Sequence, residues 1–260
     1  MQIYNCNEIE NIDVESIRDS IKENAYSVIR GLFDETEIIK KRNFIEKSFN
    51  HIKDIKHDPK EVHLAKQNIQ KIVIGNAEGV WRFYRKFYNP LFNDDIYEMH
   101  DVFKLLIKLR NKLSYRDQSF TLDNKDDKYW TCPMITQYPT GGGFMEAHRD
   151  FVSSALANDM GISFIRLIFI MSQKGSDFQT GGAYITHKGK KIFVEDNCKP
   201  GDVLLYDGNT RHGVDVIDSL KMLDLTSPKG RYNAMVPVFR EFSSSKDRDD
   251  FNTRYLNQKK

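Results

Sequence analysis

Apolar residues in the first part of the chain recur at the spacing of amphipathic helices. This pattern predicts one helix just after Asp13, a second over residues 35–49 behind Asp34, and a long third one within 96–113. Both aspartates precede their apolar runs in the way that helix-capping residues do. Between the first two helices, Tyr26–Phe33 alternates loosely and predicts a strand. The first part of the chain is therefore expected to be mainly helical.

Beyond about residue 115 the pattern changes to short β-rich runs separated by Gly, Pro, Asp and Asn. Residues 162–171 form a nearly continuous apolar run, which is typical of a strand buried on both faces. Short strands with turn signals between them favour a sandwich or a barrel. The last residues are charged and polar, as in a tail or a surface helix. Further strands are predicted over residues 130–138, 182–186, 191–194, 203–206, 213–217 and 232–239.

The composition narrows the class of protein. The 260 residues include 12% aromatics, more than a disordered chain carries. Lys and Arg number 39 against 37 Asp and Glu, so the net charge of +2 excludes a strongly basic nucleic-acid coat. Cys6, Cys132 and Cys198 include no C-x-x-C pair, which argues against a disulfide scaffold or a zinc ribbon. We see no signal peptide and no apolar run of about 18 residues, so the expected location is cytoplasmic, without a membrane partner.

Two histidines and an aspartate form the candidate chemical site. His148 and Asp150 stand two residues apart and can share one face of a strand. His212 follows a predicted strand and a turn, and it opens the next strand. Two His and one carboxylate make the facial triad of non-heme Fe(II) oxygenases. Arg231 opens a later strand, and its guanidinium could bind a carboxylate through two hydrogen bonds. On spacing alone, a surface His-Asp pair and a surface ion pair of Arg231 explain these residues equally well.

The order of motifs adds information that no single motif carries. The chain runs from His-x-Asp through buried strands and Gly181-Gly182 to Pro-Gly-Asp-Val-Leu-Leu-Tyr at 200–206, His-Gly-Val at 212–214 and Gly-Arg-Tyr at 230–232. Over residues 130–240 this order resembles the Fe(II)/2-oxoglutarate-dependent oxygenases, and most of all their prolyl-hydroxylase-like branch. The resemblance implies a mostly β fold with added α-helices, whose core is a double-stranded β-helix of the jelly-roll, cupin-like type.

In this interpretation the chain is one structural unit with three regions. Residues 1–115 form an N-terminal helical buttress that packs on the barrel. Residues 116–241 form the double-stranded β-helix core, and residues 242–260 form the charged tail. The resemblance makes His148, Asp150 and His212 the catalytic metal ligands, with Fe(II), 2-oxoglutarate and O2 as cofactors.

The same resemblance assigns residues around the cosubstrate. Arg231 would bind the distal carboxylate of 2-oxoglutarate. Tyr138, which precedes the His-x-Asp strand, could hydrogen-bond that carboxylate or simply be a wall aromatic. Asn233 shares a strand face with Arg231 and could also touch the cosubstrate. Glu146, two residues before His148, could hold a cationic substrate group, although a solvated glutamate explains it as well.

The reaction implied is hydroxylation of an unactivated C–H bond in a small molecule, such as an amino acid or a related metabolite, with release of succinate and CO2. Related halogenases carry a small residue where this chain has Asp150, so we expect no halogenation. The sequence does not specify the substrate or the oligomeric state, and no nucleic-acid partner is expected.

Three other interpretations stay open at this level. Arg231-Tyr232-Asn233 resembles part of the motif of AlkB-type nucleic-acid demethylases, but Pro237 stands where that family has a second arginine. The stretch 81–88 interleaves basic and aromatic residues, as a nucleic-acid surface does, or as a strand or helix with packed aromatics does. A peptidyl-prolyl hydroxylase would need an open groove, for which residues 140–143 offer a hinge or only a tight turn. The last alternative is a non-catalytic jelly-roll that binds a ligand.

Overall fold

A computed structural model describes residues 2–49, 55–56, 66–77, 79–122, 128–162 and 164–256. In this part of the chain a 13-stranded mixed sheet curls on itself, and a two-stranded sheet lies beside it. No helix in these ranges has the length and apolar character needed to cross a bilayer. The helices are α1 (Val14–Asn24), α2 (Glu35–Ser48), α3 (His100–Leu113), α4 (Phe151–Met160) and α5 (Ser245–Phe251), with short helical turns at Ile9–Asn11 and Asn252–Leu256. The strands are β1 (Gln2–Asn5), β2 (Tyr26–Arg30), β3 (Ile55–Lys56), β4 (Gln70–Ala77), β5 (Val80–Tyr88), β6 (Tyr129–Thr131), β7 (Met134–Pro139), β8 (Phe144–His148), β9 (Ile165–Ile170), β10 (Gly182–His187), β11 (Lys190–Phe193), β12 (Val203–Asp207), β13 (His212–Asp215), β14 (Gly230–Met235) and β15 (Val238–Arg240).

The strand order is that of a jelly roll. One half of the curled sheet runs β12-β9-β14-β7, and the other half runs β8-β13-β10-β11. Strand β5 joins them, because it pairs with β7 along its second half and with β8 at Arg82 and Phe83. Strands β1 and β2 extend the first half beyond β12. The fold is therefore the mostly β, jelly-roll type that the sequence predicts.

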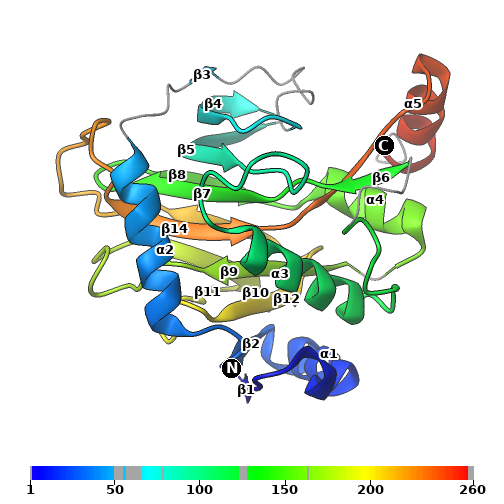
Figure 1. Cartoon of the computed structure of the whole chain (residues 1–260), viewed down its shortest axis with the longest axis horizontal. Coiled ribbons are helices and arrows are strands. Elements are labelled where there is room, and N and C mark those ends of the chain that lie inside the picture. The colour runs from blue at the N-terminus through cyan, green and yellow to red at the C-terminus, as the bar shows by residue number, and fades with distance from the viewer. Residues whose placement is uncertain are drawn as a thin grey trace.

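The largest apolar core lies on the outer face of the first half of this sheet. Side chains of α1, α2 and α3 pack there against residues of β2, β9, β12 and β14, and Figure 1 shows α2 and α3 crossing that face of the sheet. The opposite faces of β7, β9, β12 and β14 point into the barrel, because side chains alternate along a strand. Helix packing on one side thus fixes which residues line the interior on the other.

Caps and breakers explain several element boundaries. Asp13 and Asp34 accept hydrogen bonds from the backbone N–H groups of Ser16 and Glu37, as predicted for caps of α1 and α2. The predicted strand 130–138 is instead two strands, β6 and β7, separated around Pro133. In the same way Pro237 separates β14 from β15.

Three regions differ from the sequence-based picture. The part before residue 115 contributes β1, β2, β4 and β5 to the main sheet as well as helices, so it is less helical than predicted. The stretch 81–88 is a strand. Helix α4 was not predicted. It follows Asp150 directly and packs through Leu156 on Phe251 of α5, so the charged last segment has a buried anchor.

Candidate active site

The predicted ligand cluster forms at one end of two paired strands. His148 ends β8, His212 opens β13, and the two residues are register partners. Asp150 follows β8 at the start of α4. His148 Nε2 lies 3.5 Å from Asp150 Oδ1, and His212 Nε2 lies 3.5 Å from Asp150 Oδ2. One donor atom from each residue lies within 4.8 Å of the other two, which is compact enough for a single metal ion.

Both imidazoles are oriented for metal binding by their own strands. His148 Nδ1 lies 2.8 Å from the carbonyl oxygen of Glu146, and His212 Nδ1 lies 2.9 Å from that of Thr210. A carbonyl accepts a hydrogen bond only from a protonated Nδ1, so Nε2 of each ring keeps its lone pair. These are the nitrogens that face Asp150.

The electrostatics of Asp150 also fit a cation. Burial opposes ionisation of this carboxyl, but Arg166 and the two histidines outweigh it, so the pKa of Asp150 lies well below its usual range. Burial lowers the pKa of His212 to about 4, which keeps the ring neutral. Asp150 Oδ2 is buried without a hydrogen-bond partner in the described residues. A buried carboxylate oxygen with an unused lone pair, beside two free Nε2 atoms, fits an Fe(II) ion.

Glu146 does not join this cluster. Its side chain is exposed, and Oε2 accepts a hydrogen bond from the backbone N–H of Trp81 at 3.0 Å. The simple alternation of β8 fails here because the register with β13 shifts between His148 and Met145. This irregularity places Met145 beside His148 on the cavity wall and turns Glu146 outward.

Arg231 is buried and ion-paired. Its Nε lies 2.8 Å from both carboxylate oxygens of Glu195, and its Nη2 lies 2.7 Å from Oε1. Its Nη1 donates to Asn233 Oδ1 at 2.9 Å. A guanidinium has five N–H groups, so one remains on each terminal nitrogen to bind a carboxylate in the cavity. Glu195 had no motif around it, and the sequence did not reveal it.

Tyr138 lies next to this arginine, as its register on β7 requires. The Arg231 guanidinium carbon lies 5.0 Å from the centre of the Tyr138 ring. Burial raises the pKa of the Tyr138 phenol, so the group stays protonated and can donate a hydrogen bond. Within the described residues its oxygen contacts only the sulfur of Met145, at 3.9 Å.

A cavity of about 370 Å³ joins these groups. This volume lies in the usual range for small-ligand pockets. The ligand cluster, Arg231, Tyr138 and Asn233 all line it. Apolar wall residues include Met134, Met145, Ile168, Ile185, Leu204, Val214 and Met235.

Strand β5 forms part of the cavity wall. Arg82, Tyr84 and Lys86 alternate along the strand and all face the cavity. Phe83 and Phe87 are buried on the other side. The basic and aromatic stretch 81–88 is thus largely an interior wall, which removes the main support for a nucleic-acid surface there.

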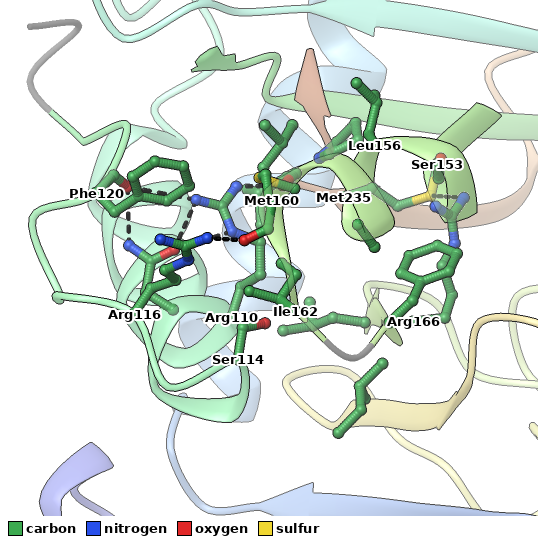
Figure 2. A pocket seen from close by; sticks show the side chains of 18 residues that line it. Arg110, Ser114, Arg116, Phe120, Ser153, Leu156, Met160, Ile162, Arg166 and Met235 are labelled. Carbon is green, nitrogen blue, oxygen red and sulfur yellow. Dashed lines mark hydrogen bonds between the residues drawn. The ribbon is translucent and has the colours of Figure 1, made fainter. Parts of the chain in front are cut away.

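A second, smaller cavity of about 70 Å³ lies on the other side of α4. Figure 2 shows Arg110, Arg116 and Phe120 at one side of it and Ser153, Arg166 and Met235 at the other. Ser153, Leu156, Arg166 and Met235 line both cavities. Helix α4 therefore forms a partition between the two spaces.

Comparisons with known proteins now give the fold a family context. No family model matches the chain, and no curated protein sequence matches it. Solved structures do. A 2OG-Fe(II) oxygenase family oxidoreductase from Burkholderia pseudomallei is 12% identical, with a TM-score of 0.50, and the match covers 92% of this chain and 95% of that one. The non-heme alpha-ketoglutarate-dependent epimerase SnoN from nogalamycin biosynthesis is 9% identical, with a TM-score of 0.52 over 87% of this chain and 82% of that one. This chain has the fold of the 2OG-Fe(II) oxygenases. Its His-Asp-His cluster and buried arginine fit the cofactors of that fold, Fe(II), 2-oxoglutarate and O2.

Proposed function

We propose that the protein is an Fe(II)- and 2-oxoglutarate-dependent dioxygenase that hydroxylates a C–H bond of a small molecule and releases succinate and CO2. The His148-Asp150-His212 cluster carries this proposal, because its three donor atoms converge in a cavity that also holds a buried arginine. The fold shared with 2OG-Fe(II) oxygenases supports it.

Each part of the site has a task in this reaction. His148, Asp150 and His212 would hold Fe(II), which with 2-oxoglutarate and O2 supplies the oxidant for a C–H bond. Arg166, whose Nε lies 3.3 Å from Asp150 Oδ2, holds that carboxylate in position. Arg231 would bind the distal carboxylate of 2-oxoglutarate, with the Tyr138 hydroxyl as a neighbouring donor. The apolar wall excludes water from the reacting atoms.

The carboxylate ligand also bears on the type of product. Asp150 occupies a ligand position that a halide would need, so hydroxylation without halogenation is expected. SnoN is an epimerase by its title, so the product must be analysed directly. With 18O2, a hydroxylase incorporates one labelled oxygen into the substrate, whereas an epimerase inverts a centre without adding oxygen.

The first experiment is an anaerobic titration of the protein with Fe(II) and 2-oxoglutarate, followed by visible difference spectroscopy. We expect a weak charge-transfer band in the wild type and in His187→Ala, a histidine outside the cluster. His212→Ala should abolish the band. Arg231→Lys, which keeps a cation beside Glu195, should raise the Kd of 2-oxoglutarate at least tenfold.

Thermal unfolding of each metal-free variant controls for misfolding. A wild-type protein that binds iron but gives no band with 2-oxoglutarate would overturn the proposal. That result would favour the non-catalytic jelly-roll.

A further inference from the structure

The positive charges on the cavity wall are not equally neutralised. Arg231 is paired with Glu195, and Arg166 lies against Asp150. Lys86 also lines the cavity, but no carboxylate forms an ion pair with it in the described part of the chain. Its ammonium group lies 5.6 and 5.9 Å from the ring centres of Tyr84 and Tyr88. Asp150, the one acidic side chain among the described cavity-lining residues, is committed to the metal cluster.

Lys86 stands in a row of hydrogen-bond donors. The strand register pairs Lys86 of β5 with Thr136 of β7, and Thr136 with Asn233 of β14. All three residues line the cavity. Lys86, Thr136 and Asn233 are called the donor row below.

The neutral members of the donor row have unused hydrogen-bonding capacity. Thr136 is 1% exposed, and its Oγ1 has no hydrogen-bond partner among the described residues. Asn233 is 3% exposed and uses its Oδ1 to accept from Arg231, while its Nδ2 makes no hydrogen bond within the same residues. Buried polar groups without partners cost free energy, and a bound anion would supply partners to all three donors at once.

The donor row is distinct from the expected 2-oxoglutarate anchor. Arg231 pairs with Tyr138 in the neighbouring row, two residues along each strand. Side chains two residues apart on one strand face are separated by roughly 7 Å. The barrel wall therefore offers two places for oxyanions side by side.

We propose that Lys86, Thr136 and Asn233 form a subsite for a carboxylate of the primary substrate, which makes that substrate an organic acid. This inference rests on the proposed oxygenase function. It replaces the cationic substrate expected from Glu146, whose side chain lies outside the cavity. The other possible source of the same chemistry is the distal carboxylate of 2-oxoglutarate, and the experiment separates the two.

The test is calorimetric titration of the anaerobic Fe(II)–2-oxoglutarate complex, in which no turnover occurs. The probes are carboxylic acids matched to their own methyl esters, drawn from amino acids, hydroxy acids and short dicarboxylic acids. We expect at least one acid to bind ten or more times tighter than its ester. Lys86→Met and Thr136→Val should each remove most of this preference, and Lys86→Arg should retain it.

The controls fix the interpretation. Lys190→Met removes one exposed lysine, and it should leave the acid preference unchanged. Thr136→Val should not lower the melting temperature, because the hydroxyl it removes has no partner. The Kd of 2-oxoglutarate should stay within twofold in Lys86→Met.

Two results would overturn the inference while leaving the oxygenase function intact. One is a wild-type complex that binds no probe acid more tightly than its ester, including one that binds none. The other is a tenfold rise in the Kd of 2-oxoglutarate in Lys86→Met, which would assign the donor row to the cosubstrate. Failure of the oxygenase proposal is distinct, because the Fe(II)–2-oxoglutarate band would then be absent from the wild type.

Discussion

Glu195 and Arg231 form a two-point ion pair in the interior, with Nε–Oε2 and Nη2–Oε1 distances of 2.8 and 2.7 Å and side chains 5% and 2% exposed. Glu195 Oε2 also accepts from the backbone N–H of Ala183 at 2.8 Å. The pair therefore ties the first turn of β14 to β10. It also fixes which N–H groups of Arg231 remain for a ligand.

Breaking this pair should destabilise the protein strongly. We predict that Glu195→Ala lowers the free energy of unfolding by about 3–5 kcal/mol, because it leaves a buried guanidinium without its counter-charge. Replacing both partners, as in Glu195→Leu with Arg231→Met, should cost less than Glu195→Ala alone. Urea unfolding measures both. Asp19→Asn, which breaks an exposed pair with Lys22 (73% and 75% exposed), should change the value by less than about 1 kcal/mol. Equal effects of Glu195→Ala and Asp19→Asn would contradict the prediction.

The stability of the metal-free protein should depend on pH through His212. Burial holds its folded pKa at about 4, against about 6.5 when unfolded. The unfolded state therefore binds the proton first, so this contribution is complete above about pH 6.5 and is lost as the pH falls towards 4. Between pH 7 and pH 5 the loss is roughly 2 kcal/mol.

Denaturant unfolding of the wild type and of His212→Gln, with a chelator present, checks this. The wild type should lose more stability on acidification than the variant. Asp150 contributes little in this window, because its depressed pKa matters only near and below its unfolded value of about 3.9. Parallel pH curves for the two proteins would contradict the assignment to His212.

The three cysteines should differ sharply in reactivity. Burial raises the pKa of Cys132 to about 12 and also raises that of Cys198, and both side chains are buried. Cys6 is partly exposed. Because the thiolate is the reactive form, an aromatic disulfide reagent should titrate one thiol quickly in the native protein and three after unfolding. Fast reaction of two or more thiols in the native state would show that a buried cysteine is accessible.

Gly230 should be required for the position of Arg231. It has a φ of +144°, and a Cβ there would lie 2.1 Å from the carbonyl oxygen of Tyr138. Gly230→Ala should therefore disturb the β7–β14 pairing and raise the Kd of 2-oxoglutarate at least tenfold. Gly189→Ala is the matched control, since Gly189 has a φ of +75° but no atom within 4 Å of a built Cβ. It should cost only about 1 kcal/mol of stability and leave the Kd unchanged. Similar Kd values for the two variants would contradict the close-contact argument.

The metal ligands were predictable because each is fixed locally. His148 and His212 terminate strands whose apolar pattern is clear, and Asp150 follows at the spacing expected for one side of a metal. The jelly-roll core followed from short strands and their breakers. Helix α4 was not foreseen, because residues 151–160 carry no capping signal and little helical periodicity.

The second layer of the site depends on contacts between distant strands, which a single sequence does not specify. Glu195 reaches Arg231 across 36 residues, and Lys86 reaches Thr136 only through the pairing of β5 with β7. Glu146 was misjudged for a local reason, since one register shift in β8 inverts the direction of its side chain. Charged residues in strands beside a metal motif are therefore worth testing as inward-facing groups even when the sequence gives them no motif.

Helix α4 has a consequence for how this site can diversify. Its first residue follows the metal ligand Asp150 directly, and Leu156, two turns along, lines both cavities while packing on α5. A smaller residue at 156 would join the two spaces and admit a longer substrate, but it would also loosen the helix that holds Asp150. Substrate size and metal retention are thus inherited together, and selection for one is paid in the other.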